Sequence, residues 1–192
     1  MSQTIRSFIA IELPEAVGSL LGKVQQNLRA LHLKAGWVHP QNIHLTLKFL
    51  GNITTADIDK VGMAMKAAAE DFKPFTLTVG GIGFFPGIKR PRVIWVGVGG
   101  QTQALFALQR SLEDRLAAAG FPKERRSFKG HLTLGRFRKG PDSAAISRVI
   151  QEYTDIGKEE FNTRQIVLFK SELKPSGAVY SQLLKTDLRN EY

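Results

Sequence analysis

The tetrapeptide His44-Leu45-Thr46-Leu47 occurs a second time as His131-Leu132-Thr133-Leu134. Each copy lies in a short segment rich in apolar and β-branched residues, which predicts a strand. Side chains alternate along a strand, so the histidine and threonine of each copy share one face and the leucines occupy the other. We therefore expect the leucines to pack under helices while His and Thr line an open face.

The rest of the chain places similar elements, in the same order, around the two copies. Short apolar runs predict strands at about 5–13, 43–50, 75–84, 93–98, 130–137, 160–172 and 179–188. Apolar residues at 3.6-residue spacing predict amphipathic helices that begin near Pro14, Thr55, Gly100 and Pro141. The last two strands, joined through Pro175-Ser176-Gly177, suggest an antiparallel hairpin. Because no Gly/Ser-rich linker separates the halves, we expect one α+β domain over residues 1–192 that consists of two packed lobes.

The charge of the chain favours a polyanionic partner. Lys and Arg number 27 and Asp and Glu 17 among 192 residues, a net charge of +10. Seven basic residues lie between Lys123 and Lys139, and a smaller cluster spans 89–92. Cations attract phosphates, and the aromatic residues between them could stack on bases. The alternative is that these cations are solvated loop residues and that most of the aromatics belong to the core.

The composition excludes several kinds of site. Cys is absent, so disulfides, a cysteine nucleophile, iron–sulfur clusters and thiolate zinc sites are ruled out. Only four His are present and no carboxylate lies near the two motif histidines, so we expect no metal site and no cofactor. The start of the chain lacks the pattern of a signal peptide and no run approaches the length of a membrane span. We expect a soluble, cytoplasmic monomer.

Two imidazoles from separate halves of the chain, facing one cleft, suggest acid–base chemistry. Cleavage of a phosphodiester needs one group to take a proton from the nucleophile and another to give one to the leaving oxygen. The ordinary histidine pKa near 6.5 allows either role near neutral pH. Thr46 and Thr133 could donate hydrogen bonds to phosphoryl oxygens, and this scheme requires no metal.

The longer segments around the two copies resemble a known family. They are Phe8–Pro14, Trp37–Gly51 and Arg126–Arg136. They are similar to the LigT-like RNA 2′,3′-cyclic phosphodiesterases, also called 2′-5′ RNA ligases, within the two-histidine phosphoesterase superfamily. The resemblance implies a bilobal fold in which two antiparallel sheets face a central cleft, with helices outside and a pseudo-twofold duplication.

The resemblance also implies an activity and roles for single residues. The family hydrolyses RNA 2′,3′-cyclic phosphate ends to 2′-phosphates, with reversible 2′-5′ ligation as a secondary activity. By resemblance, His44 is the proton donor to the leaving oxygen and His131 is the proton acceptor, while Thr46, Thr133 and Arg136 bind the phosphate. The RNA is then the partner of this site.

Two positions test the alternation rule. Arg136 lies five residues after His131, so a regular strand would place it on the leucine face; a bulge near Gly135 would correct this. Lys48 lies on the face of His44 by alternation, either near the phosphate or simply solvated.

Two other functions remain open from the residues. One is a non-catalytic RNA-binding module of the same fold. The other is a cyclic phosphodiesterase for a small nucleotide such as ADP-ribose cyclic phosphate, for which the same histidines would serve.

Overall fold

The computed structural model describes residues 4–153, 156, 159–175 and 177–189, and these form an α+β fold, as the sequence predicts. The strands and helices occur in this order: β1 (Thr4–Ile11), α1 (Glu15–Ala30), β2 (Gly36–Trp37), η1 (Pro40–Asn42), β3 (Leu45–Thr54), α2 (Asp57–Ala69), β4 (Phe75–Phe85), β5 (Val93–Gly100), α3 (Thr102–Ala118), β6 (His131–Arg136), α4 (Ser143–Glu152), β7 (Glu160–Thr163), β8 (Gln165–Lys174) and β9 (Gly177–Asp187). Each expected helix forms, and α4 begins where predicted, with the Asp142 side chain accepting a hydrogen bond from the Ala145 N–H at 2.7 Å.

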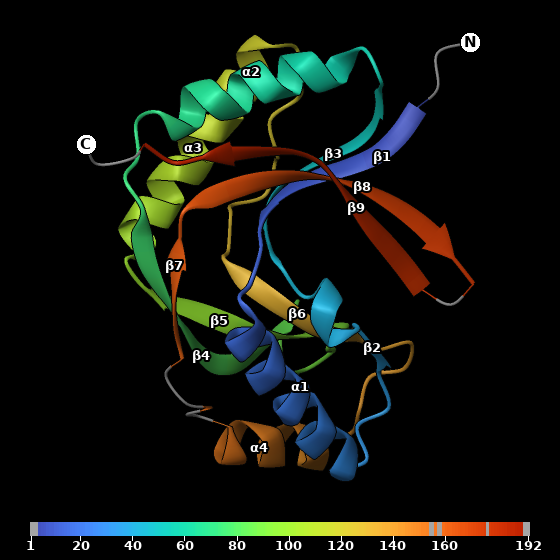
Figure 1. The fold of residues 1–192 in the computed structure, drawn as a ribbon. Helices are drawn as coiled ribbons and strands as arrows, with labels where there is room; N and C mark the ends of the chain where they lie inside the picture. The colour runs from blue at the N-terminus through green and yellow to red at the C-terminus, as the bar shows by residue number, and fades with distance from the viewer. Residues whose placement is uncertain (1–3, 154–155, 157–158, 176, 190–192) are drawn as a thin grey trace.

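The strands form one curled antiparallel sheet in the order β7-β4-β5-β6-β3-β1-β8-β9, with β2 added alongside β6. The sheet consists of two halves of four strands with matching order, β3-β1-β8-β9 and β6-β5-β4-β7. We call them the β3 half and the β6 half. Helices α2 and α3 lie outside the β3 half, and α1 and α4 lie outside the β6 half (Figure 1). This arrangement agrees with the duplication that the sequence predicts.

The two halves of the sheet meet at the repeated tetrapeptides. Leu45 and Leu132, the same position in each copy, are the register pair that joins β3 to β6. The two sheets expected from the sequence are therefore the halves of one continuous sheet. An antiparallel pair at these leucines places His44 beside Thr133 and Thr46 beside His131, all on one face.

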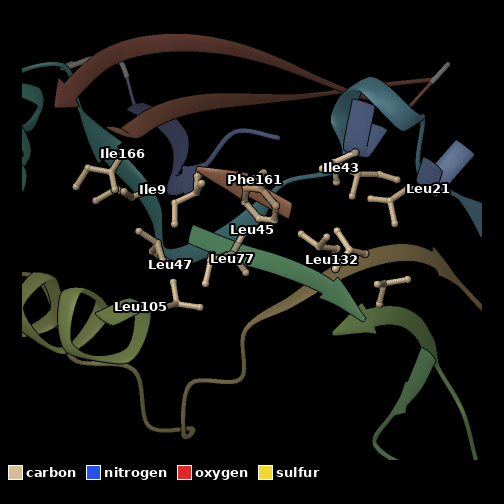
Figure 2. Packing of buried hydrophobic residues seen from close by; sticks show 14 of the residues in the cluster. Ile9, Leu21, Ile43, Leu45, Leu47, Leu77, Leu105, Leu132, Phe161 and Ile166 are labelled. Carbon is tan, nitrogen blue, oxygen red and sulfur yellow. The ribbon is translucent and has the colours of Figure 1, made fainter. Parts of the chain in front are cut away.

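The leucines of both tetrapeptides are buried, as predicted. Leu45, Leu47, Leu132 and Leu134 belong to the main hydrophobic core, which fills the space between the sheet and its helices (Figure 2). A second, smaller cluster lies on the opposite face of the sheet and contains Phe8, Ala10, Val167 and Phe169, with Tyr180 packed against it. This cluster lies on the concave face of the curled sheet, away from the helices, and we call it the apolar floor.

One predicted element differs in the structure. The expected strand 160–172 is two strands, because the chain leaves the sheet at Arg164 and changes halves. The first part, β7, pairs with β4 in the β6 half, and the second, β8, pairs with β1 in the β3 half. The expected hairpin with β9 is confirmed. Each half of the sheet thus contains strands from both halves of the sequence. The early strand β4 lies in the β6 half, and the late strands β8 and β9 lie in the β3 half.

Candidate active site

His44 lies just before β3 and is half-buried against the apolar floor of the concave face. Its ring stacks on Phe8 with centroids 4.6 Å apart and meets the Tyr180 ring edge-on at 5.3 Å. Ala10 lies opposite Thr46 and belongs to the same apolar cluster as Phe8. The position of His44 is therefore fixed by aromatic contacts on β1 and β9.

His131 opens β6 and has an aromatic environment of its own. The Phe85 ring meets it edge-on at 4.8 Å, and the Trp95 indole lies at 6.1 Å. Gly83 makes room for that indole, since a Cβ there would lie 2.2 Å from its ring. The strands β4 and β5 thus position His131 as β1 and β9 position His44.

The two imidazoles are held by the same local hydrogen bond. His44 Nδ1 lies 2.8 Å from the carbonyl oxygen of Asn42, and His131 Nδ1 lies 2.7 Å from that of Lys129. A carbonyl only accepts, so Nδ1 carries the hydrogen in both rings. Each neutral ring therefore keeps the lone pair of Nε2 for a ligand in the cleft. The backbone carbonyl two residues before each histidine selects this tautomer.

Burial lowers the pKa of both histidines. The pKa of His44 falls from 6.5 to about 4, mainly through burial; the Asn42 carbonyl opposes this, and the charges of Arg136 and His131 add to it. Burial also lowers the pKa of His131, against the effect of the Lys129 carbonyl, and Arg136 lowers it further. Both rings are therefore neutral in the free protein at pH 7. Because Arg136 affects both rings and His131 affects His44, the three groups share one electrostatic environment.

Thr46 and Thr133 are both half-buried and lie on the histidine face of their strands. Thr46 is paired with Ala10 of the apolar floor, and Thr133 is paired with Trp95, whose ring contacts His131. The structure thus brings the two predicted threonines to the same face as the two histidines.

Bulges set the direction of the side chains beyond each tetrapeptide. Between β6 and β5 the pairing passes from Thr133–Trp95 to Gly135–Ile94, so Leu134 is an extra residue. The bulge reverses the alternation after Leu134 and turns the exposed Arg136 to the cleft side. The sequence anticipates such a bulge, and it explains how Arg136 acts on both imidazoles.

An equivalent bulge in β3 corrects the prediction for Lys48. The pairing passes from Thr46–Ala10 to Lys48–Ile9, so Leu47 is the extra residue. Lys48 is consequently turned to the core side, where it is buried, and its Nζ lies 2.8 Å from Glu113 Oε2 and 2.7 Å from the Pro122 carbonyl oxygen. It is neither solvated nor in the cleft.

The same bulge brings an aromatic residue that the sequence analysis missed to the cleft face. Phe49 pairs with Phe8, its ring lies 6.2 Å from the Phe8 ring, and 60% of the residue is exposed. Phe49 and Arg136 occupy the same position in the two copies, five residues after the histidine. Aligning the copies beyond the fourth residue is the signal that would have revealed Phe49.

Two cavities border the site, one beside His44 and the other beside Arg136. The larger, about 1060 Å³, is lined by His44, Phe169 and Gln182 and by the first turns of α1. The smaller, about 500 Å³, includes Arg136 and Trp37. Tyr180 of β9 lines both cavities, so the two cavities are neighbours on the same side of the site.

The two basic clusters of the sequence are adjacent in the structure. Arg92 Nη1 donates to the Arg138 carbonyl oxygen at 3.1 Å, and the Phe137 N–H donates to the Arg92 carbonyl oxygen at 2.8 Å. Exposed basic residues from both clusters therefore border β6, the strand of His131. They are Lys89, Arg90, Arg92, Arg136, Arg138 and Lys139. Phe137 itself is buried in the core, so this ring is part of the fold rather than a base-stacking surface.

None of the helices in the described part of the chain has the length and apolar composition needed to cross a membrane. Over those same ranges, no three His, Asp or Glu side chains gather in a way that could hold a metal ion.

A sheet that presents one histidine and one threonine from each of two duplicated strands is the arrangement of a two-histidine phosphoesterase. Comparison with known proteins narrows this class. The sequence profile described as LigT-like phosphoesterase matches the chain twice, over residues 11–95 and 96–180. The chain therefore belongs to the LigT-like phosphoesterase family, and both halves of the duplication match its profile.

Relatives and solved structures agree with this membership. The chain is 32% identical over 179 residues to a protein of Thermotoga maritima, covering 93% of each chain, and 33% identical over 196 residues to one of Thermus thermophilus, covering 98% of this chain and 92% of the relative. Both relatives are named RNA 2′,3′-cyclic phosphodiesterase. A crystal structure of a Thermus thermophilus protein matches with a TM-score of 0.79 at 27% identity, covering 98% of this chain and all of that one. Escherichia coli LigT shares the fold, with a TM-score of 0.75 at 23% identity and the same coverage of both chains.

Proposed function

We propose that this protein hydrolyses the 2′,3′-cyclic phosphate at the end of an RNA to a 2′-phosphate. The observation that carries the proposal is the matched pair of imidazoles. Each has Nδ1 bonded to a backbone carbonyl, so the lone pair of Nε2 is available to a ligand, and the pairing of Leu45 with Leu132 puts each beside the threonine of the other copy. The names of the relatives supply the substrate class.

The two histidines have different roles at the phosphorus. His131 Nε2 takes a proton from a water molecule as the water oxygen bonds to phosphorus. The bond from phosphorus to O3′ breaks, and O3′ receives a proton from Nε2 of the His44 imidazolium, which forms when the phosphate binds. In-line displacement requires the attacking and leaving oxygens to lie on opposite sides of phosphorus, which suits one imidazole from each half of the sheet. No metal ion takes part in this scheme.

Neighbouring residues stabilise the transferred group. The hydroxyls of Thr46 and Thr133 donate to the non-bridging oxygens, and Arg136 balances the negative charge that accumulates on them. The exposed Phe49 ring offers a stacking surface for the nucleobase. The basic residues beside β6 attract the remaining RNA backbone. A 5′-hydroxyl in place of water gives 2′-5′ ligation by the same proton transfers.

The test is incubation with an oligonucleotide that ends in a 2′,3′-cyclic phosphate, with comparison of the product against synthetic 2′- and 3′-phosphate standards. We expect the 2′-phosphate, and a loss of about 10²–10⁴ in kcat for His44→Gln or His131→Gln. A 3′-phosphate product would mean that the other oxygen leaves. Salt-sensitive binding without turnover would identify an RNA-binding module, and a much higher kcat/KM for ADP-ribose cyclic phosphate would identify a small-nucleotide enzyme.

A further inference from the structure

At each bulge a buried glutamine donates to a backbone carbonyl oxygen; the one at Leu134 also accepts from the Val38 N–H at 2.9 Å. Gln25 of α1 donates from Nε2 to the Leu134 carbonyl oxygen at 2.9 Å and to that of Val38 at 2.7 Å. Gln109 of α3 donates from Nε2 to the Leu47 carbonyl oxygen at 3.4 Å. Leu134 and Leu47 are the two extra residues of the bulges. The same kind of side chain therefore meets the same backbone atom in both copies.

The two glutamines are equivalent positions of the duplication. Both project from the inner face of the first helix after the corresponding strand, β1 or β5, and they are 1% and 9% exposed. Each acts across the duplication, because α1 covers the β6 half and α3 the β3 half. A polar side chain is buried in a helix–sheet interface at a cost unless its hydrogen bonds are made. Here the partner in both cases is a bulge carbonyl.

The side chain that each bulge turns to the cleft differs between the two copies. The bulge at Leu134 turns Arg136 to the cleft, and the bulge at Leu47 turns Phe49 to it. On the Leu47 side the contacts extend further: Gln109 Nε2 lies 3.4 Å from Glu113 Oε1, and the other oxygen of Glu113 binds Lys48. The Glu124 N–H also donates to Glu113 at 3.2 Å. This connects the β3 bulge to the loop that leads to His131.

We infer that Gln25 and Gln109 are positioning residues, which hold the two bulges so that Arg136 meets the phosphate and Phe49 meets the nucleobase. The inference rests on the proposed function for the identity of these two contacts. It assigns to each glutamine a separate effect. Gln25 acts through Arg136 on the charge of the transition state, and Gln109 acts through Phe49 on the binding of the base.

The test uses Gln25→Met and Gln109→Met, which keep the length of the side chain and remove the donor. Gln103→Met, at an exposed position of α3, is the matched control. With the cyclic phosphate oligonucleotide, we expect Gln25→Met to lower kcat roughly 10- to 100-fold with little change in KM. Gln109→Met should raise KM by a similar factor with little change in kcat. Circular dichroism and unfolding midpoints establish that each variant is folded under the assay conditions.

Double variants separate positioning from a general effect on stability. Gln25→Met combined with Arg136→Ala should lose little more than Arg136→Ala alone, whereas Gln25→Met combined with Phe49→Ala should lose the product of the two single effects. Gln109→Met should show the opposite pattern. Additive losses in all four combinations would overturn the inference, as would the same kcat and KM changes for both glutamines. If the wild type does not hydrolyse the cyclic phosphate, the proposed function fails. The positioning role of Gln109 is then tested by the affinity for adenosine 2′-phosphate. Gln109→Met and Phe49→Ala should each weaken this binding, and the double variant should bind little more weakly than Phe49→Ala alone.

Discussion

The pKa of His44 sets the sharpest requirement on the proposed mechanism. Burial lowers it to about 4 in the free protein, so at pH 7 only about one molecule in a thousand carries the proton that a general acid needs. A bound phosphate reverses this. A negative charge about 4 Å from the imidazolium contributes about 4 kcal/mol at an effective dielectric constant near 20, which is about a thousandfold in proton affinity. We therefore expect phosphate binding to return the pKa of His44 to its ordinary range.

The assay is a titration of the histidine Cε1–Hε1 resonances by NMR, without ligand and with saturating adenosine 2′-phosphate. His44→Gln assigns the resonance. We expect its midpoint to lie far below 6.5 in the free protein and to rise when the nucleotide binds, and we expect the nucleotide to bind more tightly as the pH falls. A midpoint near 6.5 without ligand, or one that the nucleotide leaves unchanged, would refute the reasoning.

The remaining predictions concern stability, pH and metal dependence. Because the pKa of His44 is lower in the folded than in the unfolded chain, the unfolded chain binds more protons between pH 6.5 and about 4. As the pH falls through this range, the wild type should therefore lose about 2–3 kcal/mol of unfolding free energy relative to His44→Gln. Urea titration at each pH measures this loss. Lys48→Met leaves the largely buried Glu113 carboxylate without its cation and should cost about 3–5 kcal/mol in the same assay, while an unchanged midpoint would show that the ion pair is dispensable. The rate of hydrolysis should be the same with and without EDTA; restoration of a lost rate by a divalent ion would show that acid–base catalysis by two histidines is insufficient. The pH–rate curve should be bell-shaped, and His131→Gln should remove its acidic limb, since that limb reports deprotonation of the base.

The alternation of residues in the two tetrapeptides predicts much of the fold and site. It places Leu45 and Leu132 in the core, and it places the histidines and threonines together on the opposite face. These features depend on local pattern alone, and both halves of the chain carry the same pattern. The expected hairpin of β8 and β9 is predicted in the same way, from a turn sequence between two apolar runs.

The rest depends on contacts between distant segments. The bulge at Leu47 lies in the pairing of β3 with β1, and Gln109 of α3 donates to the Leu47 carbonyl; neither partner is visible from the strand's own sequence. Alternation therefore fails at Lys48, which is buried, and at Phe49, which is exposed in the cleft. The break at Arg164 has a similar origin, since β7 and β8 pair with different halves of the sheet.

The most direct test of the central claim is the kcat of His44→Gln, of His131→Gln and of the double variant, measured under single-turnover conditions on one cyclic phosphate oligonucleotide. Groups that act together on one reacting centre give strongly non-additive losses. We expect each single variant to lose about 10²–10⁴ in rate, and the double variant to lose little more than the worse of the two. Losses that multiply in the double variant, or a single variant with the wild-type rate, would contradict the claim that the two imidazoles serve one phosphate.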